Sequence, residues 1–551
     1  MGLRGFSLKE RAVGQTRSIV EWSSEHFERH RQPLRIAIDQ ANWWYKNITP
    51  EKESQIKRQS PGSHPRERSI MERICYLLRM NVQLIFVFDG PNKPWKSRPR
   101  GQNYSASNVA LLKELLDQLG VPRHDAPGEA EAECGRLQEL GVVDAVWSDD
   151  SDTFMFGCKT VVQFHKPEGH DFKSEDSVLV YTADGLLDRS KLSKEGMLMY
   201  AILVGCDYAD GLPSVGTSTL LEIAKHHKFE EAATILAKSV SNQHRELSKW
   251  RAMLLRIVKD AYPSKNFALP PNTFPNPRVL QSCSRPNVST DSKLGGLVIH
   301  WFRPFRPNLF ARYRFLLEHF HSRKHPSWPA EYLVPIELNH RLRERHSEFD
   351  YGIMEKTPMG PKKEGTVSVN PTLVIPELLD IPLRDPKTGQ ACEFEEVKAI
   401  LLDCVIKQGL PNVMEKATQK ARRGRPKKVA AGDRNKEFAK LNPECNSPSQ
   451  DGQSRKRNSN SLVENENYRL LGVSDKLKKG LANALNLDNA AVQNRSILER
   501  APIIILDDEG IENRSLDDGR TNVARKKQKT EIPSLADIAV IDLTEADWRG
   551  K

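Results

Sequence analysis

Short apolar runs that end in an aspartate recur along the first part of the chain. They lie at residues 34–39 (LRIAID), 82–89 (VQLIFVFD) and 142–150 (VVDAVWSDD). Runs of this kind, separated by helical patterns, predict the strands of a parallel sheet. Apolar residues with helical spacing occupy 69–80, 108–120 and 129–141, and Gly141 ends the last of these helices. The pattern predicts an α/β fold with a mostly parallel central sheet and flanking helices.

The later part of the chain has a different pattern. An apolar segment leads to Asp207, and residues 211–227 form a glycine-bounded turn followed by a helix. Residues 243–325 favour helices with proline interruptions, and 330–420 contain short apolar runs with one predicted helix at 393–409. From residue 421 the composition shifts to Lys, Arg, Asn, Ser and Asp, which predicts a disordered tail.

Composition narrows the classes of protein. With 551 residues the chain is too long for one compact core, so we expect two or more domains. A net charge of +11 favours a polyanionic partner such as nucleic acid. The 8 cysteines form no CxxC pair, which argues against a zinc site or a disulfide framework. We expect neither a membrane span nor a signal peptide.

Two acidic clusters stand about twenty residues apart, at 126–133 (APGEAEAE) and 148–152 (SDDSD). In a parallel sheet the ends of the strands meet at one edge, so Asp39, Asp89 and Asp150 should lie close together. Asp152 would face the same way as Asp150, and Glu129 and Glu131 would open a helix. Such carboxylates repel each other and resist burial, so a cation, a helix dipole or solvent must compensate them.

Each position has a structural explanation as well as a functional one. An aspartate after a strand often caps the next helix, and glutamates in a first turn often only balance the helix dipole. For the whole set on one sheet edge, we expect a metal site instead. Carboxylates without a His or Cys partner select Mg²⁺ or Mn²⁺, and several of them suggest two ions.

Six sequence blocks also resemble a known family. They read MGLRGF, AIDQANWWY, VFDGPNKPWK, APGEAEAECGRL, SDDSDTFMFG and GCDYADGLPSVG. In this order they resemble the structure-specific flap endonuclease/XPG nucleases over roughly residues 1–320. The resemblance implies that the metal ligands are Asp39, Asp89, Glu129, Glu131, Asp150, Asp152 and Asp207. Glu133 and Asp149 fall outside the family pattern, and we assign them no metal.

Basic residues and a helical hairpin complete the expected site. The resemblance implies that Lys96 stabilises charge in the transition state, with Arg98 or Arg100 as the second cation; the alternative is a solvated basic loop. Residues 211–225 resemble the family's helix-two-turn-helix, which binds duplex phosphates, often with K⁺. The expected DNA contacts are Gly2, Gly211, Gly216, Thr217, Lys225 and Lys228. The alternative for this segment is an ordinary helical hairpin.

Two further features favour the GEN/Yen-type Holliday-junction resolvases within the family. The segment between Asp89 and Glu129 is short, and FPNPRVLQSC and WFRPF resemble these enzymes. We expect nuclease regions at 1–105 and 106–210, a helical DNA-binding region at 211–325, and a divergent chromodomain-like module at 330–420. A generic extension of the nuclease is the alternative for that module.

The tail, 421–551, carries short motifs. RRGRPKK resembles an AT-hook, with Arg423 and Arg425 in the minor groove, or is a nuclear import signal. Two segments resemble SUMO-interacting motifs, which add a strand to a sheet edge, and a chance apolar patch is the alternative. Their apolar residues are Ile503, Ile504, Ile505 and Leu506 in the first, and Val540, Ile541 and Leu543 in the second.

The sequence therefore predicts a nuclear, Mg²⁺-dependent endonuclease that resolves four-way DNA junctions, a monomer when free and a dimer on the junction. A 5′-flap endonuclease is the alternative within the class. A scaffold that binds DNA or SUMO without cutting is the alternative outside it. Three histidines, His319, His321 and His325, are expected to lie on a wet helix surface and not to bind metal.

Overall fold

The computed structural model describes most of the first three quarters of the chain, and these residues lie within one compact unit, Met1–Asn489. The described residues are 3–94, 106–169, 173–213, 215–239, 243–264, 270–301, 308–320, 326–344, 355–356, 363–384 and 389–411. None of their helices is both long and apolar enough to cross a membrane.

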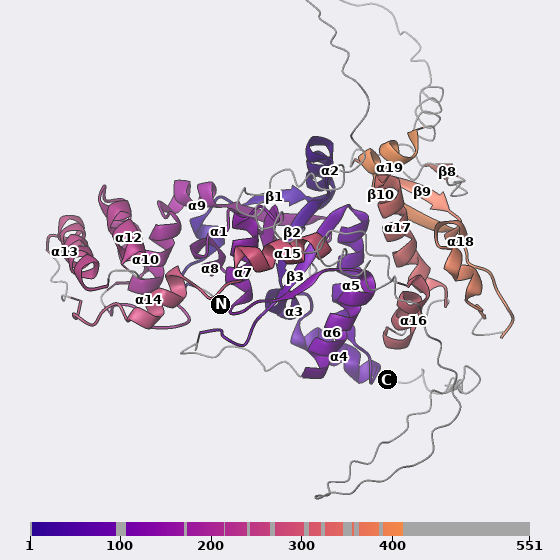
Figure 1. Ribbon diagram of the computed structural model, residues 1–551, viewed down its shortest axis with the longest axis horizontal. Helices are drawn as coiled ribbons and strands as arrows, with labels where there is room; N and C mark the ends of the chain where they lie inside the picture. The colour runs from indigo at the N-terminus through magenta and orange to yellow at the C-terminus, as the bar shows by residue number, and fades with distance from the viewer. Residues whose placement is uncertain are drawn as a thin grey trace, which may run out of the picture. The chain divides into compact units, whose positions relative to one another are not determined.

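A seven-stranded mixed sheet forms the centre, in the order β1-β7-β6-β5-β2-β3-β4 (Figure 1). Its strands are β1 (Gln15–Ser18), β2 (Leu34–Asp39), β3 (Val82–Phe88), β4 (Arg123–Asp125), β5 (Ala145–Trp147), β6 (Thr160–Phe164) and β7 (Ser177–Thr182). The five strands β2 to β6 run parallel, while β7 pairs antiparallel with both β6 and β1. The mostly parallel α/β sheet predicted from the sequence is thus confirmed.

The buried residues of the central strands point alternately to the two faces of the sheet, so they form two separate hydrophobic cores. In β2, Ile36 and Ile38 face one core and Ala37 faces the other; in β3, Phe86 and Val87 divide in the same way. Successive side chains of a strand point to opposite faces, so a strand buried on both faces reads as a continuous apolar run. This explains why the sequence of these strands shows no polar alternation.

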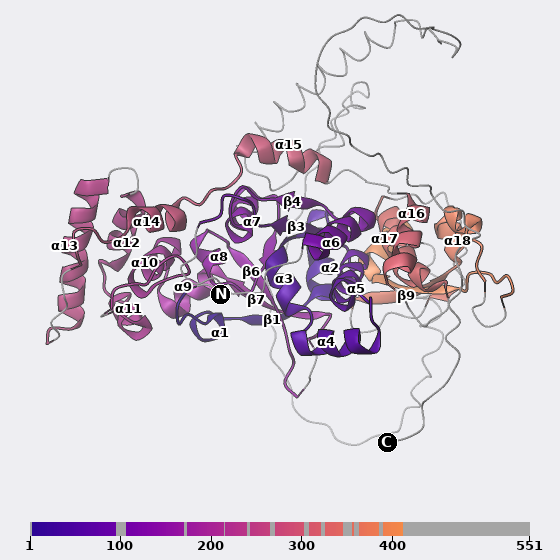
Figure 2. The same cartoon turned by 90° about the horizontal axis from the view of Figure 1, so that it is seen from below.

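Helices cover both faces of the sheet (Figures 1 and 2). The helices around the first half of the sheet are α1 (Leu8–Arg11), α2 (Ile19–His30), α3 (Gln40–Lys46), α4 (Pro50–Gln59), α5 (Pro65–Arg79), α6 (Ala106–Leu119), α7 (Ala130–Glu139), α8 (Asp152–Met155) and α9 (Ala183–Ser190). Those that follow are α10 (Lys194–Val204), α11 (Thr217–Ile223), α12 (Phe229–Lys238), α13 (Gln243–Ala261), α14 (Pro277–Ser284), α15 (Asp291–Trp301), α16 (Leu309–His319) and α17 (Trp328–Arg343). Helices α2, α3, α5 and α6 pack in one core, and α7, α8 and α10 pack in the other.

A second, three-stranded antiparallel sheet follows α17, in the order β10-β9-β8. Its elements are β8 (Glu355–Lys356), β9 (Glu364–Val369), α18 (Pro371–Val374), the 3-10 helix η1 (Pro376–Asp380), β10 (Val397–Leu402) and α19 (Asp403–Gly409). Its buried residues belong to the same hydrophobic cluster as α5 and the first core of the large sheet. The Nδ2 atom of Asn339 in α17 also donates to the carbonyl of Leu78 in α5, at 3.1 Å.

The single helix predicted over 393–409 is wrong. Residues 397–402 form strand β10, and only residues 403–409 are helical. Val397, Ala399 and Leu401 are buried while Lys398 between them is exposed, which is the two-residue alternation of a strand. The antiparallel partner β9 supplies the backbone hydrogen bonds, and this long-range pairing is invisible to local periodicity.

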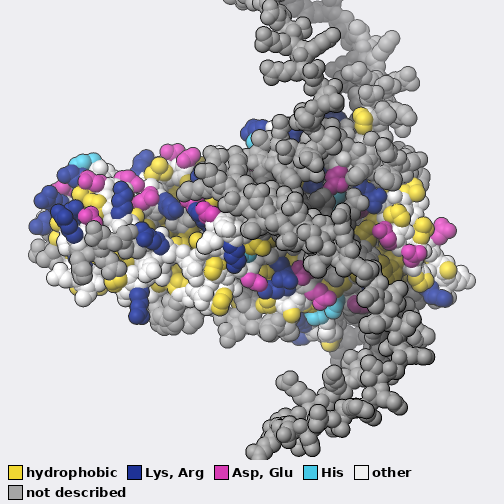
Figure 3. Space-filling model, in the orientation of Figure 1, with side chains coloured by type: hydrophobic (Ala, Val, Ile, Leu, Met, Phe, Trp, Pro, Cys, Tyr) yellow, Lys and Arg dark blue, Asp and Glu magenta, His cyan; other side chains and the backbone are white. Residues whose placement is uncertain are grey.

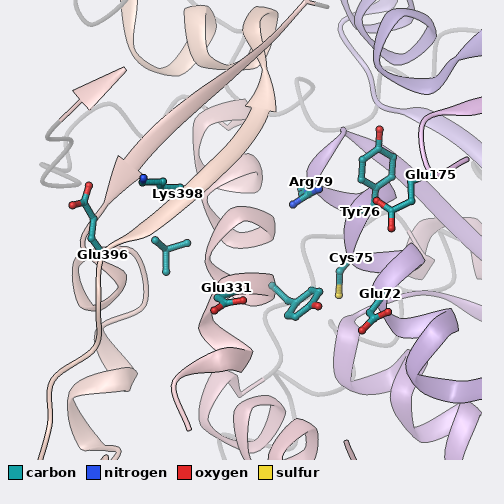
Figure 4. Close-up of a pocket in the computed structure, with 10 residues that line it drawn as sticks. Glu72, Cys75, Tyr76, Arg79, Glu175, Glu331, Glu396 and Lys398 are labelled. Carbon is teal, nitrogen blue, oxygen red and sulfur yellow. The ribbon is translucent and has the colours of Figure 1, made fainter. Parts of the chain in front are cut away.

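A cavity of about 550 Å³ lies where this second sheet meets the helices of the seven-stranded sheet (Figure 4). Its walls come from α5, α17 and β10, and they include Tyr76, Arg79, Glu331 and Lys398. The guanidinium of Arg79 lies over the ring of Tyr76, 5.1 Å from its centroid. The second sheet, through β10, and helices α5 and α17 therefore all contribute side chains to this partly polar cavity.

Candidate metal and nucleic-acid site

The strand order places three predicted aspartates at one edge of the sheet. After β2 the chain builds β3 and β4 on one side, and then returns to place β5 on the other side of β2. Asp39 ends β2, Asp89 follows β3, and Asp150 follows β5. Ligand sites in open α/β sheets lie at such a switch point, outside the carboxyl ends of the strands.

Gly90 lets the loops after β3 and β4 approach each other closely. The amide of Gly90 donates to the carbonyl of Gly128 at 2.7 Å, and a Cβ on Gly90 would meet the Ala126 carbonyl oxygen at 1.8 Å. This approach brings Asp89 to the start of α7, where its Oδ1 accepts from the amide of Ala130 at 3.0 Å. Asp89 therefore lies beside the helix that carries Glu129 and Glu131.

Ser148 connects the first and third aspartates. Its hydroxyl donates to Oδ2 of Asp39 at 3.0 Å and accepts from the amide of Asp150 at 3.1 Å. The Oδ1 atom of Asp150 in turn accepts from the amide of Asp152 at 3.2 Å. Ser148 is fully buried, and the sequence analysis did not single it out although it begins the second acidic cluster.

Asp39 also caps a helix, which was the structural alternative to metal binding. Asp39 is the N-cap of α3, and its Oδ1 accepts from the amide of Asn42 at 3.4 Å. The other carboxylate oxygen faces Ser148 at the sheet edge. One side chain thus both ends a strand at the cluster and begins the next helix, so the two explanations do not exclude each other.

Among the other predicted ligands, Glu129 and Glu131 lie at the start of α7, and Asp207 lies in the loop after α10. Glu129 is the N-cap of α7, and its Oε2 accepts a hydrogen bond from the hydroxyl of Tyr208. Tyr208 follows Asp207 directly, so this bond ties the loop of Asp207 to the helix of Glu129 and Glu131. Sequence reasoning missed Tyr208, because a lone tyrosine in an apolar segment gives no chemical signal.

Electrostatic effects on pKa link several of the predicted carboxylates. Burial, followed by the charge of Asp89, raises the pKa of Asp39 to about 7; Asp150 adds to the rise, and the hydrogen bonds from Ser148 and Asn42 oppose it. Burial also raises the pKa of Cys134, with Asp39 and Glu131 among the further causes. Asp39, Glu129, Glu131, Asp150 and Asp152 are all buried, whereas Asp89 is exposed and Asp207 partly so.

The donor set fits a hard divalent cation. Asp and Glu oxygens are the ligands that Mg²⁺ prefers, and a dication would relieve the repulsion that raises the pKa of Asp39. Over the described ranges, no group of three or more His, Cys, Asp or Glu side chains is arranged to hold a metal ion by itself. Mg²⁺ commonly uses only one or two carboxylates and completes its shell with water and substrate phosphates.

Glu133 and Asp149, which were assigned no metal, have other partners. Glu133 is fully buried, and its carboxylate lies 2.7 Å from Nε2 of His124 and accepts from the amide of Ser289 at 2.8 Å. These bonds hold the chain before α15 against α7. Asp149 pairs with Lys46, at 3.2 Å.

Basic side chains lie beside acidic residues of this region, but the predicted ones are not among the described residues. Lys96, Arg98 and Arg100 are outside the described residues, and so are Gly2, Arg423, Arg425, the two SUMO-type motifs, His321 and His325. Within the described residues, Lys93 contacts Asp89 at 3.2 Å. Lys173 also lies near Asp149, and burial lowers its pKa to about 8. His319 packs against the ring of Phe315.

The predicted phosphate-binding turn borders the amino-terminal segment. Gly211, Gly216 and Thr217 line a cavity of about 470 Å³ together with Arg4 and Gly5. The hydroxyl of Tyr200 joins the two sides: it donates to the Arg4 carbonyl and lies 2.7 Å from Oγ1 of Thr217.

The two predicted lysine contacts lie beyond this turn. Lys225 is exposed and pairs with Glu222, and Lys228 precedes α12. Further Lys and Arg side chains gather, among acidic ones, at the end formed by α12 and α13 (Figure 3).

The amino-terminal segment also reaches the acidic cluster. The amide of Leu3 donates to Oγ of Ser151, which stands between Asp150 and Asp152, and the amide of Arg4 donates to the Gly205 carbonyl. The turn and the carboxylates are therefore joined through residues 3–5, although they are separate in the sequence.

Comparison with known proteins agrees with this arrangement. Residues 120–207 match the family model of the XPG I-region. The chain is therefore similar to the flap endonuclease/XPG family in this region, as the six sequence blocks indicated. Its relatives include flap endonuclease GEN homolog 1 of Mus musculus, 29% identical over 233 residues, and of Homo sapiens, 30% identical over 211 residues. These matches cover 38% and 34% of this chain, but only 24% and 22% of the relatives.

Solved structures extend the likeness beyond the I-region. A structure of the eukaryotic junction-resolving enzyme GEN-1 with cesium is 28% identical, with a TM-score of 0.63. The aligned region covers 76% of this chain and 100% of the GEN-1 chain. A structure of the Holliday junction-resolving enzyme GEN1 with product DNA and Mg²⁺ is 28% identical with a TM-score of 0.59, and covers 75% and 98%. The shared fold therefore includes segments outside the I-region.

The assignment of Glu133 as a structural residue can be tested by Glu133→Ala. Removing one partner of a buried pair leaves His124 and the Ser289 amide without their acceptor, so we expect a loss of about 3–5 kcal/mol in the free energy of unfolding. Chemical denaturation measures this loss. Glu139→Ala, at an exposed position of the same helix, should cost less than about 1 kcal/mol. A stability equal to that of the unaltered protein would contradict the assignment.

Proposed function

We propose that this protein is a Mg²⁺-dependent, structure-selective DNA endonuclease whose principal substrate is the four-way DNA junction. The observation that carries the proposal is the convergence of both acidic clusters on one edge of the sheet, within a fold similar to that of GEN1. The solved GEN1 structures contain product DNA with Mg²⁺, or Mg²⁺ and Mn²⁺, and others contain potassium or sodium. By analogy, the reaction is hydrolysis of a phosphodiester in branched DNA.

The proposed roles follow from the positions of the side chains. Asp39, Asp89, Glu129, Glu131, Asp150, Asp152 and Asp207 would hold two Mg²⁺ ions, which when bound supply Lewis-acid activation of the phosphate and of water. Most of these carboxylates are buried away from bulk water, and Asp89 is the most open to a substrate. Lys93 near Asp89, with Lys96 and Arg98 or Arg100, would balance the charge that develops on the phosphate.

Duplex binding is proposed for the turn at 211–217. Its backbone amides and the exposed Lys225 would contact phosphates without reading sequence, with K⁺ as the monovalent ion. Residues 3–5 join this turn to the acidic cluster through the Tyr200 hydroxyl and Ser151. Binding a duplex at the turn would therefore fix the distance from the duplex to the cutting site.

The first test of the nuclease is Asp39→Asn. Loss of a central carboxylate should cost several kcal/mol in the transition state, roughly a 10²–10³-fold fall in cleavage rate. Junction affinity, measured by fluorescence anisotropy, should change little because the duplex anchor lies elsewhere. The isosteric control Asp117→Asn removes a surface charge paired with Arg123 and should cut normally. Chelation of Mg²⁺ should stop cleavage by every variant, and full activity of Asp39→Asn would reject this site.

The choice of a four-way junction over a 5′ flap rests on the short segment between Asp89 and Glu129. A long arch would require a free 5′ end to thread, and a four-way junction has no such end. The described part of this segment contains helix α6, strand β4 and the loop to α7. A 5′-flap endonuclease is the second candidate function, because several relatives carry that name.

A plasmid-borne cruciform separates these two candidates. Two copies bound to one junction would each cut one strand, and their shared DNA raises the effective concentration for the second cut. We therefore expect linear product to exceed nicked circle, and a 5′ flap with a blocked end still to be cut. The free protein should sediment as a monomer. Accumulation of nicked circles, with no cutting of blocked flaps, would instead indicate a threading flap endonuclease.

The carboxyl-terminal half is proposed to direct the nuclease rather than to cut. Three antiparallel strands followed by α19 support a chromodomain-like module at 330–420. For the tail we propose minor-groove binding or nuclear import through Arg423 and Arg425, SUMO binding through the two apolar-acidic motifs, and a nuclear location. A scaffold without catalysis remains the alternative outside the class, and the Asp39 test distinguishes it.

The tail proposal is tested by replacing Val540, Ile541 and Leu543 together with Ala, with and without Ala at Ile503–Leu506. Removing the apolar residues should abolish strand addition, so poly-SUMO pull-down should fall about tenfold or more, as expected for loss of over 1.4 kcal/mol. Intrinsic cleavage of a synthetic junction serves as the control and should not change. Unchanged pull-down by the variant with both motifs replaced would exclude SUMO binding through these segments.

A further inference from the structure

Tyr208 is a buried side chain that contacts the acidic cluster without belonging to it. Its hydroxyl donates to Oε2 of Glu129, and the two residues are far apart in the sequence. Glu129 is the N-cap of α7, but its side chain makes no capping hydrogen bond to the helix. The carboxylate therefore accepts from the phenol and does not cap its own helix.

The loop that carries Tyr208 is held by contacts that do not involve its hydroxyl. The amide of Cys206 donates to the Ala209 carbonyl at 3.0 Å, and Gly205 and Asp210 form an isolated bridge. The Sγ atom of Cys206 lies 3.9 Å from that of Cys283 in α14. These contacts hold the loop on both sides of Tyr208, so removal of the hydroxyl alone should leave the loop in place.

The same loop also carries Asp207, directly before Tyr208. Gly211 closes the loop, since a Cβ there would lie 2.2 Å from the Leu203 carbonyl oxygen. Asp207 and Tyr208 are neighbours in this short closed loop, so a fixed loop sets both side chains together. Tyr208 reaches the cluster as a hydrogen-bond donor to Glu129.

We propose that Tyr208 is a positioning residue that sets the orientation of the Glu129 carboxylate for divalent-metal binding. This inference rests on the metal site of the proposed function and deepens it. A phenol that holds one carboxylate oxygen restricts rotation of the group and directs the other oxygen. Loss of such an outer hydrogen bond typically weakens metal affinity or activity by about 10–100-fold.

The test is Tyr208→Phe in the full-length protein. The ring and its packing are kept, and only the hydroxyl is lost. Isothermal titration of Mn²⁺ into the DNA-free protein should show a dissociation constant raised about 10–100-fold. In cleavage assays the Mg²⁺ concentration for half-maximal rate should rise similarly, with partial recovery at saturating Mg²⁺.

The matched control is Tyr313→Phe. Tyr313 is also fully buried, and its hydroxyl donates to the Pro326 carbonyl at 2.5 Å, in α16 and away from the carboxylates. This variant loses the same kind of bond, so it reports the general effect of removing a buried hydroxyl. We expect its Mn²⁺ dissociation constant to equal that of the unaltered protein.

Three outcomes decide the inference. Weaker Mn²⁺ binding by Tyr208→Phe, at an unchanged melting temperature and junction affinity, supports it. An unchanged Mn²⁺ dissociation constant, or a loss that the Tyr313 variant shares, overturns it. If the unaltered protein binds Mn²⁺ but cuts no branched DNA, the proposed function fails while the Mn²⁺ titrations still decide the role of Tyr208.

Discussion

Repulsion between carboxylates gathered at one edge of the sheet is the constraint on which the rest of this structure depends. Asp39, Asp89 and Asp150 are brought to this edge by the strand order, and burial of Asp39, followed by the charge of Asp89 and then of Asp150, raises the pKa of Asp39 to about 7. The neutral partners in contact with them are hydrogen-bond donors, such as the Ser148 hydroxyl and the amide at the start of α7. The fold tolerates the repulsion because it surrounds each acid with oriented donors.

Support for this edge comes from segments that are distant in the sequence. The amino-terminal residues contact Ser151, the loop after α10 contacts Glu129, and the chain before α15 is held by Glu133. Gly128 makes this last approach feasible, because a Cβ there would meet the Asn287 carbonyl oxygen at 2.7 Å. The I-region, residues 120–207, therefore contains five of the seven predicted ligands and only part of what positions them.

The local sequence was sufficient to predict the elements that have a strong pattern of apolar residues. Strand β2 begins and ends where its apolar run does, and the aspartates after the strands follow from sheet topology. Strand β10 was mistaken for a helix because its partner β9 is separated from it by about thirty residues of chain, and pairing of this kind leaves no local signal. Ser148 and Tyr208 were missed for a related reason: their importance lies in what they contact, which only the folded chain defines. The basic residues after Asp89 lie outside the described residues and stay predictions.

The second sheet and the first core of the large sheet share one hydrophobic cluster, so the carboxyl-terminal module does not pack by itself. Its residues pack with α5 in a single cluster, and Asn339 bonds directly to the backbone of that helix. A module attached in this way cannot be exchanged or shed as a mobile appendage. Substitutions in its core would lower the amount of folded enzyme without touching the carboxylates. Inherited variants there would behave as hypomorphs, and the two parts are constrained to evolve together.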